Sequence, residues 1–155
     1  MGLAVGSSIP LVAQPTDVTC WAASIAMLVG KTAEEVCEAA SMSVNEGYGW
    51  DQIRNAVSVW GLTEIGPACG GPDYFAPMLQ SSPLWIVEVG APYHAVVLTG
   101  MYTDADDWAA AFDTTRVTVN NPWPPGSGNV EDKPYSEFSN EYELGSGAMA
   151  QIVSR

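Results

Sequence analysis

Residues 20–29, CWAASIAMLV, form a run of small and apolar side chains interrupted only by Ser24. A short segment that is apolar on every side is typical of a buried helix, and Gly30 is the residue type that commonly ends one. The run is too short to span a membrane. Ala22 and Ala23 would let other chain segments approach this helix closely.

The rest of the chain divides into a helical part and a strand-rich part. Thr32 and Glu35 have the spacing of a capping box, which predicts a second helix from Thr32. A third helix is expected over residues 50–60, with Gly61 as its stop, and a short helix or turn over 73–80. Strands are then expected at 84–90, 94–102, 116–121 and in the closing segment AMAQIVS, with a turn at 90–92, a helical turn within 104–112 and a short helix at 135–142. This order predicts an α+β fold with an antiparallel sheet.

The length of 155 residues predicts a single domain, 1–155. The net charge of −13 argues against nucleic acid as a ligand, because phosphate binding needs clustered Lys and Arg. The first residues, MGLAVGSSIPLVAQ, lack the charged region of a signal peptide. We therefore expect a chain that is cytoplasmic, exported by a signal-less route, or cut from a longer polypeptide, with no membrane partner.

The metal-binding residue types are too few or wrongly spaced for a metal site. The three cysteines, Cys20, Cys37 and Cys69, include no C-x-x-C pair, so reduced thiols are expected rather than disulfides. With a single histidine, a zinc site is not expected. The acidic residues 104–107 lack the central Gly and the final Glu of a calcium loop. The sequence predicts neither a metal nor a cofactor.

Cys20 lies where an irregular segment enters the apolar helix. Taken alone, it would more often be a buried hydrophobic residue. A thiol at a helix start, however, meets the positive end of the helix dipole and unpaired backbone N–H groups, and both lower a thiol pKa. Gln14, six residues upstream, could place its amide beside the sulfur. Together with the Cys20 backbone N–H, it would form a two-donor oxyanion hole.

His94, the only histidine, begins a predicted strand, and Asn121 ends the next one. Antiparallel pairing of these strands would bring the two side chains together, giving a cysteine nucleophile, a base and an orienting amide. Asn121 precedes Pro122 and should be extended. Asn120 points to the opposite strand face and is the second choice. Trp21 and Trp123 are candidates to line the site, although ordinary core or loop roles suit them equally.

Three blocks between residues 14 and 123 resemble papain-like cysteine peptidases. They are Gln14 with Cys20-Trp21-Ala22-Ala23-Ser24, then Tyr93-His94-Ala95-Val96-Val97-Leu98-Thr99-Gly100, and Val117-Thr118-Val119-Asn120-Asn121-Pro122-Trp123. The resemblance is to the compact bacterial branch, with its bacteriocin-exporter peptidase domains and secreted effectors. It implies a helical part packed on an antiparallel sheet, with Cys20 as nucleophile, His94 as base and acid, Asn121 as orienting residue and Gln14 as oxyanion donor. Asn121 stands where the branch commonly has Asp.

The resemblance implies a cysteine protease that cleaves a protein or peptide substrate without a cofactor. The same triad would also suit a deamidase, an acyl transferase or a peptidoglycan amidase. A non-catalytic peptide-binding module of the same fold is a further alternative. By analogy with the secreted relatives, the chain is expected to be a bacterial effector or toxin delivered into another cell by a specialised secretion system. Such proteins often have a cognate inhibitor or immunity protein.

Overall fold

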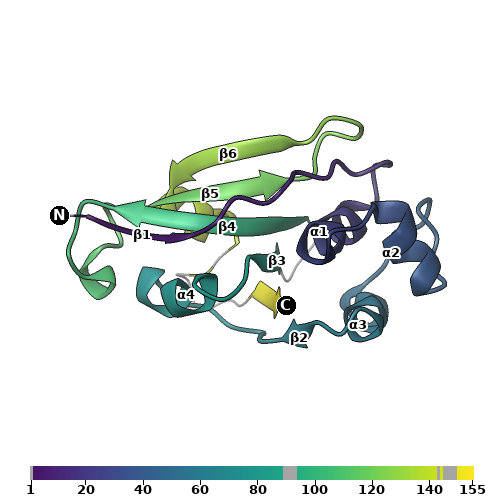
Figure 1. Ribbon diagram of the computed structural model, residues 1–155, viewed down its shortest axis with the longest axis horizontal. Coiled ribbons are helices and arrows are strands. Elements are labelled where there is room, and N and C mark those ends of the chain that lie inside the picture. The colour runs from purple at the N-terminus through teal and green to yellow at the C-terminus, as the bar shows by residue number, and fades with distance from the viewer. Residues whose placement is uncertain (1, 89–93, 143, 145–149) are drawn as a thin grey trace.

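A computed structural model describes residues 2–88, 94–142, 144 and 150–155 of the chain. The helices are α1 (Cys20–Val29), α2 (Ala33–Ala39), α3 (Trp50–Val59), α4 (Pro72–Leu79) and α5 (Tyr135–Glu141), with a 3-10 turn at Trp108–Ala110. The strands are β1 (Leu3–Gly6), β2 (Thr63–Glu64), β3 (Leu84–Glu88), β4 (Ala95–Thr103), β5 (Arg116–Asn121), β6 (Asn129–Pro134) and β7 (Ala150–Ser154). Figure 1 shows the three N-terminal helices gathered at one end of the molecule.

The strands form one antiparallel sheet in the order β2-β7-β3-β4-β5-β6. β1 pairs with the second half of β4, beyond the residues that pair with β3. In the register of β4 and β5, Val97 lies opposite Asn120, and at the end of the β5–β6 hairpin Asn121 lies opposite Asn129. The start of β4 and the end of β5 are neighbours and therefore lie at the same end of the strands, next to α1 (Figure 1).

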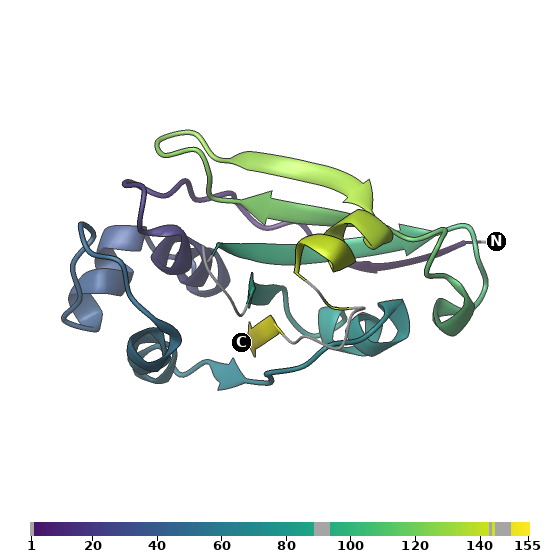
Figure 2. The same cartoon turned by 180° about the vertical axis from the view of Figure 1, so that it is seen from behind.

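Helices cover both faces of the sheet. Alternate side chains of the central strands, such as Trp85 and Val97, join one core with α1, α2 and α3. Their neighbours, such as Ile86 and Leu98, join a second core with α4 and α5. Figure 2, seen from behind, shows α5 lying across the strands on this second face. The Trp85 side chain also donates from Nε1 to the carbonyl of Trp21, at 3.2 Å, which fixes α1 to β3.

The expected α+β class, with an N-terminal helical part packed against an antiparallel sheet, is confirmed. α1 has the predicted bounds, and Gly30 ends it with a φ of 70°. The capping box of Thr32 and Glu35 is formed. The predicted turn at 90–92 and the start of the closing segment lie outside the described residues. Strands β1, β2 and β6 were not predicted, and the consequence of β6 for the site is described below.

Candidate active site

Cys20 is the first residue of α1 and is partly exposed. Its Sγ accepts a hydrogen bond from the backbone N–H of Ala95, at 3.5 Å. Ala95 is the first residue of β4 and directly follows His94. The side chain of the nucleophile candidate therefore contacts the residue next to the base candidate, although the two candidates are far apart in the sequence.

Burial raises the pKa of the Cys20 thiol, and this effect outweighs the backbone N–H groups of Ala95, Trp21 and Cys20, which lower it. The expectation that the pKa of the Cys20 thiol is lowered was therefore wrong. The helix start and its N–H groups are present, but they stabilise the thiolate less than desolvation destabilises it. A thiolate at this position needs a cation beside it.

The structure brings His94 and Asn121 into direct contact. Nε2 of the imidazole lies 2.7 Å from Oδ1 of Asn121. Asn120 points to the other face, where its Nδ2 donates to the carbonyl of Ile9 at 3.0 Å. Because adjacent residues of a strand face opposite ways, only Asn121 of the pair reaches the histidine.

Glu131 is a member of this cluster that the sequence analysis missed. Its Oε2 accepts a hydrogen bond from Nδ2 of Asn121 at 2.9 Å, and its Oε1 lies 2.7 Å from Nζ of Lys133. Glu131 lies on β6, a strand that the sequence analysis did not predict. The sequence of β6, NVEDKP, does not alternate between apolar and polar residues, so only the Pro- and Gly-rich segment 122–128 before it could have indicated a hairpin turn.

Gln14 is buried, with 1% of its surface exposed. Its Nε2 donates to the Thr16 carbonyl at 2.7 Å, and among the described residues its Oε1 has no hydrogen-bond partner. Its backbone is held by the loop after β5: the Gln14 N–H donates to the Pro122 carbonyl, and the Gly126 N–H donates to the Gln14 carbonyl, both at 3.0 Å. Gln14 and the Asn121 loop are thereby joined.

A cavity of about 170 Å³ opens beside Cys20. Trp21 and Tyr48, whose rings meet edge to face, line it together with Ile53, Val87 and Asp17. Trp21 therefore borders this cavity. Trp123 is not among the lining residues; it is 46% exposed, and its backbone N–H donates to Oδ1 of Asn121 at 3.0 Å.

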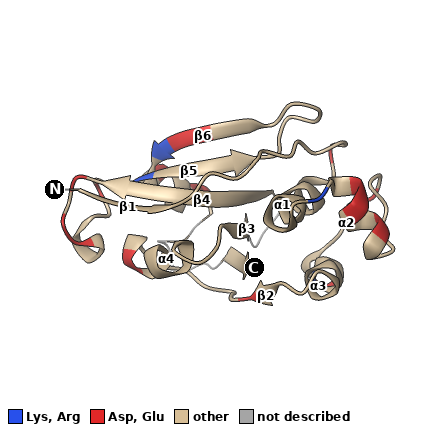
Figure 3. Cartoon of the chain, viewed as in Figure 1, with Lys and Arg blue, Asp and Glu red and all other residues tan. Residues whose placement is uncertain are grey.

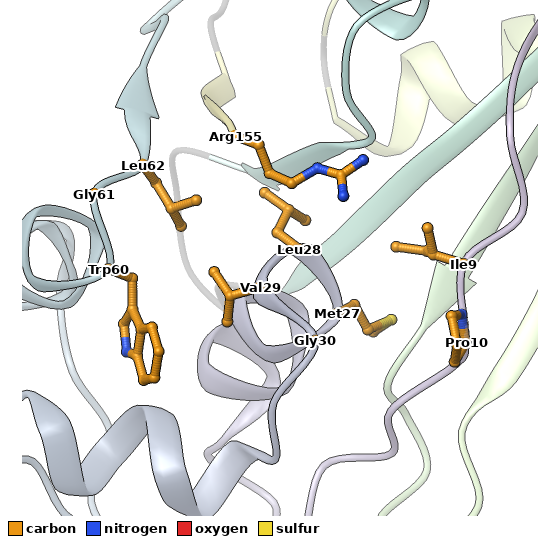
Figure 4. A pocket seen from close by; sticks show the side chains of 10 residues that line it. All are labelled: Ile9, Pro10, Met27, Leu28, Val29, Gly30, Trp60, Gly61, Leu62 and Arg155. Carbon is orange, nitrogen blue, oxygen red and sulfur yellow. The ribbon is translucent and has the colours of Figure 1, made fainter.

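A larger hollow of about 570 Å³ lies at the other end of α1 (Figure 4). Figure 4 shows the Arg155 side chain lying over Leu28, with Trp60 across the hollow. None of the four predicted catalytic and oxyanion residues lines it. Of these four residues, Cys20 lines the smaller cavity.

Charged side chains are absent from α1 and β4, which flank the site, and are abundant on α2 and the loop after β4 (Figure 3). Across the described ranges there is no cluster of His, Cys, Asp and Glu that could hold a metal. Cys20, Cys37 and Cys69 are all free thiols. In the same part of the chain, no helix is both long and apolar enough to cross a membrane.

A buried helix that begins with cysteine and packs against a sheet carrying a His–Asn pair is the arrangement of a papain-like peptidase. The sequence profile described as "Papain-like cysteine protease AvrRpt2" matches residues 4–143, and the chain belongs to this family. Among solved structures, the fold is similar to the peptidase domain of Streptococcus ComA, a bifunctional ABC transporter involved in a quorum-sensing pathway. That similarity has a TM-score of 0.62 at 14% identity and covers 95% of this chain and 98% of the ComA domain. No curated protein sequence matches significantly.

Proposed function

We propose that this chain is a cysteine protease that hydrolyses peptide bonds of a protein substrate through Cys20, His94 and Asn121. The observation that carries the proposal is the 2.7 Å contact between His94 and Asn121, formed beside the backbone N–H that binds the Cys20 sulfur. Family membership supports the same chemistry.

In the proposed reaction, the thiol proton passes to His94, because burial disfavours an isolated Cys20 thiolate but an adjacent imidazolium stabilises it. The thiolate attacks the substrate carbonyl carbon, and the amide of Gln14 and the Cys20 N–H hold the resulting oxyanion. The imidazolium gives its proton to the leaving amine. Water, deprotonated by His94, then attacks the thioester, releasing the acid and restoring the thiol.

Asn121 holds the imidazole in this reaction. Its Oδ1 accepts the Nε2–H, so that Nδ1 is left to exchange a proton with the sulfur. The proton positions follow from the hydrogen-bond partners, because Trp123 presents an N–H to the same oxygen and Glu131 presents an acceptor to the amide nitrogen.

Cleavage of unstructured protein substrates by the wild type and its variants tests the proposal. Cys20→Ala and His94→Ala should each abolish cleavage while leaving the circular dichroism spectrum unchanged. Asn121→Ala should cost more activity than Asn120→Ala, since only Asn121 reaches His94. An active Cys20→Ala variant would overturn the assignment.

Mass spectrometry of the products separates the related chemistries. Hydrolysis produces new chain ends, whereas deamidation adds about one dalton to an intact chain and acyl transfer adds an acceptor. A one-dalton shift without cleavage would replace the protease proposal with a deamidase. Binding without any covalent change would identify a non-catalytic peptide-binding module.

We also propose, by analogy with secreted relatives of this fold, that the protein is a bacterial effector or toxin exported into a target cell and restrained by a cognate inhibitor. Expression in bacterial and eukaryotic cytosol should then slow growth for the wild type and not for Cys20→Ala. Equal growth of both in both hosts would contradict this setting.

A further inference from the structure

The side-chain amide of Asn121 is held in one orientation by two groups of opposite character. The Trp123 backbone N–H, which only donates, lies 3.0 Å from Oδ1. The Glu131 carboxylate, which only accepts when ionised, lies 2.9 Å from Nδ2. Turning the amide over would set donor against donor and acceptor against acceptor. Oδ1 is therefore presented to His94.

Both oxygens of the Glu131 carboxylate have partners. Oε2 faces Asn121, with Nδ2 of Asn129 at 3.5 Å, and Oε1 faces Lys133. Lys133 is 14% exposed and also binds the Glu141 carboxylate of α5, at 2.9 Å to each oxygen. Burial raises the pKa of Glu131, but the hydrogen bonds from Lys133 and Asn121 and the Lys133 charge outweigh it and hold that pKa below its usual value. Glu131 is therefore ionised at neutral pH.

We propose that Glu131 is a positioning residue for the triad, one that locks the Asn121 amide toward His94 and supplies the negative charge that an asparagine lacks. This inference rests on the proposed function. A neutral amide can orient an imidazole but stabilises an imidazolium less than a carboxylate does. Here the carboxylate lies one hydrogen bond further out, and the polarised amide connects it to the ring.

Other charged groups near the contacts that join Glu131, Asn121 and His94 could also act on the imidazole. Lys133 of β6 faces Glu131 directly, and Glu141 of α5 faces Lys133. Across Asn121 lies His94, and Cys20 of α1 contacts the residue after His94. Asp132, the next residue of β6, points to the opposite sheet face, where it pairs with Arg116.

Because His94 is the only histidine, its imidazole can be observed alone by NMR after labelling the chain with ¹⁵N-histidine. In the Cys20→Ala chain, Glu131→Gln should move the pH midpoint of the imidazole titration downward by about 0.5 pH unit, because one charge that favours the imidazolium is removed. Asp132→Asn removes an equal charge from the same strand and should leave the midpoint in place. Equal midpoints for the two variants would overturn the proposal.

Glu131→Met separates position from charge. A Gln side chain can still accept from Asn121, so Glu131→Gln should keep the proton on Nε2. Met cannot accept this bond, and the imidazole nitrogen shifts should then report a mixture of the two tautomers. A tautomer unchanged in Glu131→Met would show that the carboxylate does not hold the amide.

A charge swap tests the link through activity. Asn121→Asp alone would place the new carboxylate against that of Glu131, and the two would repel each other. We expect kcat to fall about tenfold, as is typical when the hydrogen-bond partner of a site residue is disturbed. Adding Glu131→Gln should restore most of that loss, because the new amide can donate to Asp. Full activity of Asn121→Asp alone would contradict the role of Glu131.

The two proposals fail in different ways. A wild type without protease activity defeats the proposed function, while the histidine titration, which needs no catalysis, still decides whether Glu131 acts on His94. An active wild type whose titration is the same with Glu131→Gln as with Asp132→Asn defeats the Glu131 proposal alone.

Discussion

At the scale of single residues, Cys20 and Cys37 show how burial acts on thiols. Burial raises the pKa of Cys37 to about 11, with the Glu34 charge adding to the effect. Burial also raises the pKa of Cys20. The difference lies in the neighbours: Cys37 packs within the core, whereas Cys20 contacts the backbone beside His94. In the proposed mechanism, the reactivity of Cys20 therefore comes from His94 rather than from the helix start.

Alkylation with iodoacetamide checks this conclusion. At neutral pH the wild-type Cys20 should react faster than the exposed Cys69, and the buried Cys37 should remain unmodified. In His94→Ala the thiol, with its pKa raised above the usual 9.0, should stay protonated and react only as the pH rises past that value. Peptide mass spectrometry gives the extent at each cysteine. Equal labelling of Cys20 and Cys69 in the wild type would contradict it.

The sequence was sufficient to predict that His94 and Asn121 meet, but not the direction of the Cys20 pKa shift or the contact with Glu131. Asn121 could be chosen over Asn120 because it precedes Pro122 and lies on the opposite strand face. The direction of the Cys20 pKa could not be predicted, because it depends on how deeply β4 buries the sulfur. Glu131 could not be chosen either, since its role follows from a strand pairing that the sequence analysis did not predict.

At the scale of elements, the helices were predicted well because their signals are local. Gly30 and the capping box of Thr32 and Glu35 act within one helical turn of an end. β6, with the sequence NVEDKP, has no apolar face, and all of its residues are partly or fully exposed. Its structure comes from backbone pairing with β5. Pairing of this kind leaves little trace in composition.

β1 depends on a close approach of two glycines. Gly6 lies opposite Gly100 in the β1–β4 ladder and has a φ of 97°. A Cβ at Gly6 would lie 2.1 Å from the Thr99 carbonyl oxygen and 2.6 Å from the Gly100 Cα. A side chain at this position would therefore push β1 away from β4.

Gly6→Ala should accordingly destabilise the protein by more than Gly30→Ala. Gly30 has a φ of 70° but open space around its Cβ position, so alanine there adds only backbone strain of about 1 kcal/mol. Gly6→Ala adds a backbone collision to that strain, and we expect a loss of about 3 kcal/mol. Urea unfolding of both variants measures the difference. Equal losses would show that β1 can shift without cost.

At the scale of the whole molecule, one sheet carries two cores. Trp85 and Val87 of β3 belong to the core under α1–α3, while Leu84 and Ile86 of the same strand belong to the core under α4 and α5. Because both cores use side chains of the same strands, unfolding these strands would disrupt both cores at once. The expected single domain, 1–155, should therefore unfold in one step.

Unfolding followed by two probes tests this expectation. In a chain with Trp108→Phe and Trp123→Phe, the remaining tryptophans, at 21, 50, 60 and 85, all pack in the α1–α3 core. Their fluorescence should change at the same urea concentration as the far-ultraviolet circular dichroism of the entire chain. An earlier or later fluorescence transition would indicate that the two cores unfold separately.

The two backbone bonds between Gln14 and the loop at 122–128 have a consequence for engineering this protein. Exposed Pro- and Gly-rich loops are usually where chains accept insertions or tags. This loop is exposed at Trp123 and Gly126 and directly follows Asn121. Its Pro122 and Gly126 nevertheless form backbone hydrogen bonds with Gln14. Lengthening it would disturb the backbone positions of both Gln14 and Asn121, so fusion partners belong elsewhere on the surface.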